Sequence, residues 1–204
     1  SKRTAKKLRW VYHVLGGTRF RGALTESAVN RVVLVGFMGA GKTSVGRALA
    51  AQLGWRFFDL DHEIVSRSGR SIRDWFSDLG ESAFRREEAS VAQELLSEDE
   101  IVLATGGGWA AEQGRLSRLG ASTLSIWLEV DAEESLRRVG SDFTERPLLS
   151  RDRGVQDARG LLESRRTAYA LASLRVDTNH KSVEDVTLHI IENLELSAVK
   201  TEPK

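Results

Sequence analysis

Gly36-Phe37-Met38-Gly39-Ala40-Gly41-Lys42-Thr43 decides the fold, because this stretch matches the pattern G-x-x-x-x-G-K-[ST] of a phosphate-binding loop. The apolar run Val32–Val35 before it predicts a strand, and residues 44–49 after it indicate a helix. In this setting, glycines let backbone N–H groups surround a polyphosphate, and the N-terminus of the following helix adds positive potential. Lys42 is expected to reach the β- and γ-phosphates, and Thr43 a bound Mg²⁺. Nucleotide binding is therefore the leading hypothesis.

The length and composition of the chain indicate one domain. With 204 residues, of which 41% are hydrophobic, the sequence can bury one sizeable core. It contains no cysteine, which excludes a disulfide framework and thiolate metal sites and fits a reducing cytoplasm. The sequence has no run of about eighteen apolar residues and no signal-peptide pattern, so no membrane segment is expected. We therefore expect a cytoplasmic protein that acts as a monomer.

Charge is distributed unevenly along the chain. Residues 1–30 contain seven Lys and Arg residues and one Glu, a charge of +6; because the whole chain carries +1, residues 31–204 carry −5. An acidic body with a phosphate loop argues against nucleic-acid binding by the main domain. We interpret residues 31–196 as this main domain and residues 197–204 as a C-terminal tail.

Residues 1–30 are interpreted as a basic N-terminal extension or linker. Apolar residues at helical spacing precede Gly16 and predict a short amphipathic helix there; they are Leu8, Val11, Tyr12 and Leu15. The sequence begins at serine rather than methionine, which is compatible with a processed or trimmed chain.

Strand-like and helix-like segments alternate from residue 32 onward. The predicted strands are 32–35, 56–60, 101–104, 123–129 and 174–177; the predicted helices include 43–53, 132–139, 155–172 and 183–194, with further helical segments up to about residue 97. This alternation predicts a five-stranded parallel sheet with helices on both faces, a three-layer α/β/α fold of the P-loop NTPase type. Ser71 with Asp74, and Asp131 with Glu134, have the spacing of capping boxes at helix starts.

Two aspartates follow the second predicted strand. Asp59 and Asp61 flank Leu60, and the two-residue period of a strand would direct both carboxylates to the same side. One carboxylate can then take part in the Mg²⁺ coordination shell while the other accepts a proton from a hydroxyl nucleophile, as phosphoryl transfer requires. The alternative is an exposed acidic turn that precedes a helix.

A charged pair lies on the next helical segment. Arg85 and Glu88 are three residues apart and are therefore neighbours on one helix face. A guanidinium held in this way can bind a substrate carboxylate through two parallel hydrogen bonds. The alternative is a surface salt bridge that contributes about 0.3–0.5 kcal/mol, and spacing alone does not exclude it.

Two later segments complete the candidate site. The apolar strand 101–104 leads into Thr105-Gly106-Gly107-Gly108, where a ligand can approach the backbone without meeting Cβ atoms; a flexible loop is the alternative. Residues 140–154 are polar and contain Arg146-Pro147-Leu148-Leu149. We interpret them as a mobile lid that brings one cation to the phosphates.

Seven motifs occur in a fixed order along the chain. They are the loop 36–43, Asp59-x-Asp61, Ser71-Ile72 with Phe76, Gly80-Glu81 with Phe84-Arg85 and Glu88, Gly106–Gly108, Arg146–Leu149, and Arg165 with Tyr169. Together they resemble the shikimate kinase family, from Val32 to Leu194. The resemblance implies a nucleoside-monophosphate-kinase-like fold and ATP-dependent phosphorylation of the 3-hydroxyl of shikimate.

The resemblance also implies a role for each matching residue. ATP would be bound by Gly39, Ala40, Gly41, Lys42, Thr43, Ser44, Arg138 and Arg146, with Arg138 stacking on adenine, Thr43 on the Mg²⁺ and Asp59 in the outer shell of this metal. Shikimate would be bound by Asp61, Arg85, Glu88, Gly106, Gly107, Gly108 and Arg165. In that set the two arginines bind the carboxylate, Glu88 orients Arg85, and the glycines line the ring. Lys42, Asp61 and Arg146 would be catalytic, with Asp61 as the candidate base.

Some residues depart from the family pattern. Trp109 replaces a small residue after the glycines, and we interpret it as packing behind the pocket rather than narrowing it. Thr167-Ala168 replaces Pro-Leu before Tyr169, which leaves both Arg165 and Arg166 open as the carboxylate ligand.

Two other functions are considered. One is a kinase-like sensing domain with little turnover, regulated through the basic N-terminal segment, and the complete catalytic set argues against it. The other is a related hydroxyacid kinase such as a gluconate kinase, to which the D-x-D and F-R-x-x-E motifs are poorly suited.

Overall fold

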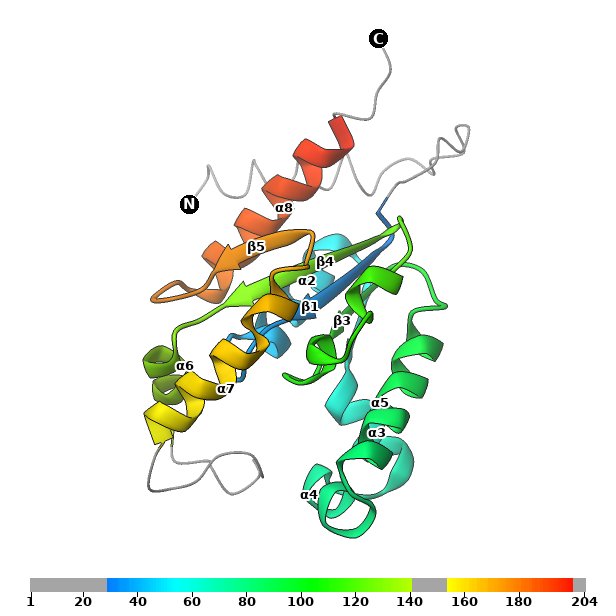
Figure 1. The fold of residues 1–204 in the computed structure, drawn as a ribbon. Helices are drawn as coiled ribbons and strands as arrows, with labels where there is room; N and C mark the ends of the chain where they lie inside the picture. The colour runs from blue at the N-terminus through cyan, green and yellow to red at the C-terminus, as the bar shows by residue number, and fades with distance from the viewer. Residues whose placement is uncertain (1–28, 141–153, 200–204) are drawn as a thin grey trace.

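A five-stranded parallel sheet forms the middle layer of the structure (Figure 1). The computed structural model describes residues 29–140 and 154–199. The strands lie in the order β2-β3-β1-β4-β5; their bounds are Arg31–Val35 for β1, Arg56–Asp59 for β2, Ile101–Ala104 for β3, Thr123–Glu129 for β4 and Leu174–Asp177 for β5. All the pairings between neighbouring strands are parallel, which confirms the predicted sheet.

Hydrophobic runs explain why β1 and β3 lie in the middle of the sheet. Val32–Val35 and Ile101–Ala104 are almost completely buried, as expected for parallel strands that are covered on both faces. Because the strands are parallel, their carboxyl ends all lie at one edge of the sheet, where ligands of such folds bind. The phosphate loop follows β1 and therefore begins at the centre of that edge.

Helices cover both faces of the sheet (Figure 1). On one face, α2 (Lys42–Leu53) packs against α8 (Val183–Val199), β2 and β3. On the other face, α7 (Gly154–Tyr169) contacts α6 (Ala132–Val139) and the short 3-10 helix η2 (Trp109–Ala111). This arrangement confirms the predicted three-layer α/β/α fold. A further 3-10 helix, η3 (Leu116–Arg118), precedes β4.

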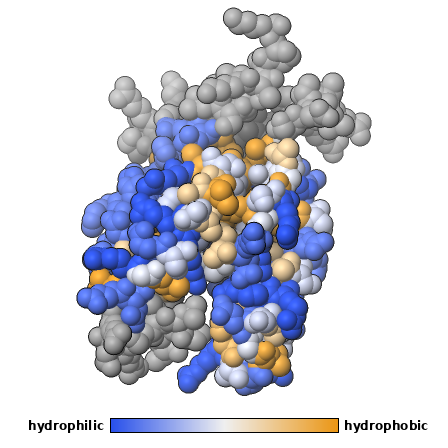
Figure 2. Space-filling model, in the orientation of Figure 1, coloured by the Kyte–Doolittle hydropathy of each residue, from blue (hydrophilic) through white to orange (hydrophobic). Residues whose placement is uncertain are grey.

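The chain between β2 and β3 forms a helical lobe, residues 60–95. It consists of α3 (Leu60–Ser68), α4 (Ile72–Asp74), the π-helical η1 (Trp75–Leu79) and α5 (Glu81–Leu95), and α3 packs against α5. Ser71 Oγ accepts a hydrogen bond from the Asp74 N–H at 3.1 Å, so Ser71 caps α4 at the predicted position. Figure 2 shows apolar residues gathered near the tip of this lobe. Leu79, the last residue of η1, is half-exposed.

Several boundaries differ from the predictions. The second strand ends at Asp59, α7 ends at Tyr169 rather than residue 172, and α8 continues to Val199 rather than residue 194. The predicted N-terminal helix, the predicted lid with Arg146 and the last residues of the predicted tail lie outside the described residues. Within the described ranges, no helix is both long enough and apolar enough to span a membrane.

The predicted capping box at Asp131 and Glu134 is wrong. Asp131 does precede α6, but its side chain makes no capping hydrogen bond, and its backbone N–H donates to Asn179 Oδ1 at 2.9 Å. The Glu134 carboxylate accepts hydrogen bonds from Arg137 at 2.7 Å and from Arg138 at 2.8 Å. These charge-assisted bonds are stronger than a bond to a backbone N–H, so the carboxylate turns toward the arginines.

Candidate active site

The phosphate loop joins β1 directly to α2. Gly41 is the N-cap residue of α2 and has the left-handed conformation, with φ 89°. Lys42 Nζ donates hydrogen bonds to the carbonyl oxygens of Gly36 and Phe37, at 2.8 and 2.9 Å. The ammonium group therefore lies over its own loop, at the N-terminus of α2, where both the helix and the lysine favour an anion.

Thr43 and Asp59 come together from two different elements. The Thr43 hydroxyl, in the first turn of α2, donates to Asp59 Oδ2 at the end of β2, at 2.6 Å. A hydroxyl and a carboxylate oxygen are hard ligands of the kind that Mg²⁺ prefers beside phosphates. The predicted pair of metal residues is thus assembled next to the loop, and the donor set suits this cation.

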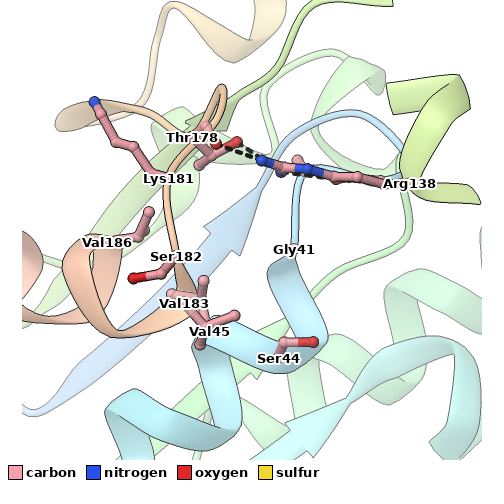
Figure 3. A pocket seen from close by; sticks show the side chains of 11 residues that line it. Gly41, Ser44, Val45, Arg138, Thr178, Lys181, Ser182, Val183 and Val186 are labelled. Atoms are coloured by element: carbon pink, nitrogen blue, oxygen red, sulfur yellow. Dashed lines mark hydrogen bonds between the residues drawn. The ribbon is translucent and has the colours of Figure 1, made fainter. Parts of the chain in front are cut away.

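A pocket of about 300 Å³ opens beside the phosphate loop (Figure 3). Its lining comes from the loop, α2, α6, the segment between β5 and α8, and the start of α8: Gly39, Ala40, Gly41, Ser44, Val45, Arg138, Thr178, Lys181, Ser182, Val183 and Val186. The Arg138 guanidinium donates to the carbonyl oxygens of Gly39, at 3.2 Å, and Thr178, at 2.5 Å. The structure thus brings Ser44 and Arg138, both predicted as nucleotide-binding residues, to one pocket.

Glu134 fixes Arg138 in this position. The hydrogen bond from Arg137, followed by that from Arg138, lowers the pKa of Glu134 to about 2, so this carboxylate stays ionised at neutral pH. Its bond to Arg138 Nε, at 2.8 Å, leaves the outer nitrogens of Arg138 directed at Gly39 and Thr178. The spacing of an acid three and four residues before two arginines could have indicated this contact in the sequence.

Asp61 lies where the loop and the helical lobe meet, although not for the predicted reason. The strand period is wrong here, because the chain becomes helical at Leu60: Asp59 is the N-cap residue of α3, and Asp61 belongs to the first turn. Burial raises the pKa of Asp61 to about 6, the neighbouring Glu88 and Asp59 add to the rise, and Lys42 opposes it. A carboxylate with a pKa near neutrality is suited to proton transfer.

Asp61→Asn is expected to stabilise the protein at neutral pH. The folded state favours the protonated carboxyl of Asp61, because its pKa is higher there than in the unfolded chain. The contribution of this group to the free energy of unfolding is therefore fully present below pH 3.8 and is lost as pH rises through about 6. The neutral amide of the asparagine side chain avoids this loss of unfolding free energy, which amounts to at most about 3 kcal/mol. Urea unfolding at pH 7.5 should show the gain, and unfolding at pH 4 should not. Equal effects at both pH values would contradict the assignment, and the exposed Asp78→Asn is the control.

Arg85 is held by acids and by aromatic rings. Its Nη1 atom lies 3.1 Å from both carboxylate oxygens of Glu88, and Nη2 lies 3.1 Å from Glu81. The guanidinium also lies 5.9 Å from the centre of the Phe76 ring and 5.4 Å from that of Phe84. The Glu88 side chain has no exposure and that of Arg85 has 12%, so the alternative of a surface salt bridge is wrong.

The three glycines lie against these groups. A Cβ atom on Gly106 would lie 2.7 Å from Asp61 Oδ1 and 2.9 Å from Glu88 Oε1. A Cβ atom on Gly108 would lie 2.7 Å from Arg85 Cζ. Because real Cβ atoms do not approach other atoms this closely, the loop can face the charged groups only where it lacks side chains.

Trp109 packs behind the glycine loop, as expected. Its side chain is 3% exposed and belongs to the hydrophobic core. The Arg115 guanidinium lies 5.6 Å from the centre of its indole ring. The tryptophan therefore supports the loop from behind rather than narrowing the space in front of it.

Helix α7 distinguishes Arg165 from Arg166. Arg165 is only 9% exposed, and its Nη1 atom would lie 3.4 Å from a Cβ atom placed on Gly107. Arg166 points outward and pairs with Glu163 at 3.1 Å and Glu129 at 3.4 Å. Successive residues of a helix point about 100° apart, and only Arg165 faces the glycine loop.

Tyr169 anchors the same part of the loop from α7. Its hydroxyl donates a hydrogen bond to the Gly107 carbonyl. Burial raises the pKa of Tyr169 to about 12, so the hydroxyl keeps its proton and remains a donor at neutral pH. This contact fixes the distance between α7, with Arg165, and the loop.

Two members of the charged cluster around Arg85 and Glu88 were not predicted from the sequence. Glu81 lies four residues before Arg85 on α5, a spacing that could have indicated the contact. Arg115 lies 2.8 Å from Glu88 Oε2 but is separated from it by 27 residues, in an irregular segment where no periodicity applies. Arg146, by contrast, lies outside the described residues, and its role stays a prediction.

The fold and the site together define a P-loop kinase of the nucleoside-monophosphate-kinase-like type. A family model described as shikimate kinase matches residues 38–195. The chain is 37% identical over 163 residues to the shikimate kinase of Persephonella marina, an alignment that covers 80% of this chain and 98% of that protein. It is 41% identical over 169 residues to that of Geobacter metallireducens, covering 83% and 94%. The chain belongs to the shikimate kinase family.

Solved structures agree with this assignment. A shikimate kinase from Acinetobacter baumannii, solved in complex with shikimate, has a TM-score of 0.77 and 36% identity, covering 86% of this chain and 97% of that one. A gluconokinase from Sinorhizobium meliloti has a TM-score of 0.54 at 17% identity. The second likeness shows a shared fold and nothing more.

Proposed function

We propose that the protein transfers the γ-phosphoryl group of ATP to the 3-hydroxyl of shikimate, with Mg²⁺ bound to the nucleotide. One observation carries the proposal: Asp61 lies beside the phosphate loop on one side and beside the buried pair of Arg85 and Glu88 on the other. Such an arrangement brings a candidate base between a phosphate donor site and a carboxylate-binding site. Membership of the shikimate kinase family supports the same reaction.

The nucleotide would bind across the loop and the adjacent pocket. Lys42 would turn from the loop carbonyls to the β- and γ-phosphates, whose charge exceeds that of a carbonyl oxygen. Thr43 and Asp59 would hold Mg²⁺, which when bound neutralises charge on the phosphates. Ser44 and Arg138 would line the remainder of the nucleotide site, with Arg138 against the base.

Shikimate would bind between the glycine loop and the helical lobe. Arg85 and Arg165 lie along the glycine loop, against Gly108 and Gly107 respectively, and would bind the carboxylate with their outer nitrogens. Glu88 keeps Arg85 in place. The bare backbone of Gly106, Gly107 and Gly108 leaves room for the ring.

In the reaction step, Asp61 would accept the proton of the 3-hydroxyl while that oxygen forms a bond to the γ-phosphorus. The bond from the γ-phosphorus to the bridging oxygen of ADP breaks, and ADP leaves with the electron pair. Lys42 stabilises the charge on the phosphoryl oxygens. From the family resemblance, Arg146 would add a second positive charge.

The pH profile of turnover is expected to report Asp61. Because the base must be ionised and its pKa is about 6, kcat/KM for shikimate should fall about tenfold per pH unit below that value. Initial rates between pH 5 and pH 8, at constant ionic strength and with a stability control at each pH, provide the measurement. A rate that stays constant between pH 5 and pH 7 would contradict this role.

A panel of hydroxyacids tests the proposed substrate. Shikimate should support ADP formation, and gluconate should neither support it nor compete with shikimate at equal concentration. Preference for gluconate would favour the rival hydroxyacid kinase, whose known structure shares only the fold. Tight shikimate binding without turnover would favour the sensing domain.

We further propose that the enzyme acts as a cytoplasmic monomer. The candidate site residues that the structure describes lie together within one chain, and the absence of cysteine from the sequence fits a reducing cytoplasm. Sedimentation should give a single species of one chain's mass with or without ligands.

A further inference from the structure

Arg115 connects the glycine loop to α5 through three contacts. Its Nη1 atom lies 2.8 Å from Glu88 Oε2, and its Nη2 atom donates to the Arg85 carbonyl oxygen at 2.9 Å. Its guanidinium lies 5.6 Å from the centre of the Trp109 ring. With a side chain only 11% exposed, Arg115 is part of the buried charge cluster rather than of the surface.

The charges in this cluster do not cancel. Glu88 is completely buried and accepts hydrogen bonds from two guanidinium groups, those of Arg85 and Arg115. The three side chains together carry one net positive charge. If Arg115 were neutral, Glu88 would cancel the charge of Arg85, and the pair would attract an anion far less strongly in this poorly solvated site.

Apart from Arg85 and Arg115, no cation among the described residues forms an ion pair with Glu88. Besides Glu88, the acids that form ion pairs with Arg85 are Glu81 at 3.1 Å and Glu112 at 4.0 Å, and their side chains are 54% and 48% exposed. Asp61 is a further buried acid near Arg85, at longer range than these ion pairs. Solvent screens these exposed carboxylates, whereas it does not reach Glu88. Glu88 is therefore the buried carboxylate that pairs directly with Arg85 and whose charge needs a permanent partner.

We propose that Arg115 is a positioning residue that balances the charge of Glu88, so that Arg85 keeps its positive charge for the substrate carboxylate. This inference rests on the proposed function, in which Arg85 binds shikimate. It assigns Arg115 no contact with the substrate. Arg115 acts through Glu88, whose Oε2 atom accepts hydrogen bonds from both arginines.

Titration calorimetry with shikimate and, separately, with the non-hydrolysable ATP analogue AMP-PNP tests the inference. Arg115→Met should weaken shikimate binding by about 10- to 100-fold and leave binding of the analogue within about twofold. Arg115→Lys keeps the charge and should stay much closer to the unsubstituted protein. The control is Arg118→Met, an exposed arginine in η3, which should change neither affinity.

A double variant separates charge balance from a purely structural role. Glu88→Gln combined with Arg115→Met removes the buried charge together with its partner, so it should fold even where Arg115→Met alone does not. Because Glu88 also orients Arg85, the double variant should bind shikimate more weakly than the unsubstituted protein, but at least about fivefold more tightly than Arg115→Met. A double variant that binds shikimate as weakly as Arg115→Met, or more weakly than that variant, would overturn the inference.

The same titrations distinguish this inference from the proposed function. If the unsubstituted protein binds no shikimate, the proposed function fails and the inference fails with it. If the unsubstituted protein binds shikimate and Arg115→Met binds it equally well, only the inference fails.

Discussion

Lys42→Ala is expected to lower kcat by about 10³-fold while the affinity for shikimate stays within about twofold. Lys42 lies at the N-terminus of α2 over the phosphate loop, and its charge is needed most as the phosphoryl group passes between two oxygens. Shikimate binds through a different set of side chains, which the substitution leaves in place. The loss should therefore fall on turnover and on the nucleotide rather than on the acceptor.

Single-turnover kinetics at saturating shikimate and calorimetric titration with shikimate give the two quantities. Arg47→Ala is the matched control, because Arg47 is an exposed cation on the same helix and stacks on Phe57, away from the loop. If Lys42→Ala lowers turnover by less than about tenfold, the proposed role of Lys42 at the phosphates is contradicted.

Arg85→Ala is expected to weaken shikimate binding by about 2–5 kcal/mol, the usual cost of truncating one partner of a desolvated charge pair. Arg85 is confined between Glu88 and the rings of Phe76 and Phe84, so its guanidinium is already oriented when the ligand arrives. Binding of ATP should change by less than about threefold, because the nucleotide pocket shares no residue with this cluster.

Arg86→Ala serves as the control for this variant, since Arg86 is the next residue on α5 and is exposed. The fold should tolerate Arg85→Ala, because Arg115 remains bonded to the buried Glu88. Thermal unfolding with and without each ligand checks both points. Equal losses of shikimate and ATP affinity would contradict the division of the site into a nucleotide end and a carboxylate end.

The fold could be predicted because each signal in the sequence is local. Buried parallel strands appear as short apolar runs such as Val32–Val35, and helices alternate with them. The boundaries were less accurate, since they depend on competing side-chain contacts. Glu134 illustrates this: its carboxylate binds Arg137 and Arg138 instead of capping α6.

The candidate site was predicted where residues are close in sequence or belong to a motif. Arg85 and Glu88 share a helix face, so their contact follows from spacing. Asp61 was predicted to face the ligand side through the period of a strand, but a helix rather than a strand places it near Glu88 and Lys42. Arg115 could not be predicted, since its contact with Glu88 depends on how the chain after the glycine loop folds back on α5.

Shikimate-dependent formation of ADP from ATP tests the central claim most directly. The unsubstituted protein, with Mg²⁺ and ATP, should release ADP only when shikimate is added, and phosphorus NMR should show one phosphate ester on the 3-hydroxyl for each ADP formed. No ADP above the shikimate-free rate, at saturating shikimate and Mg²⁺, would contradict the claim.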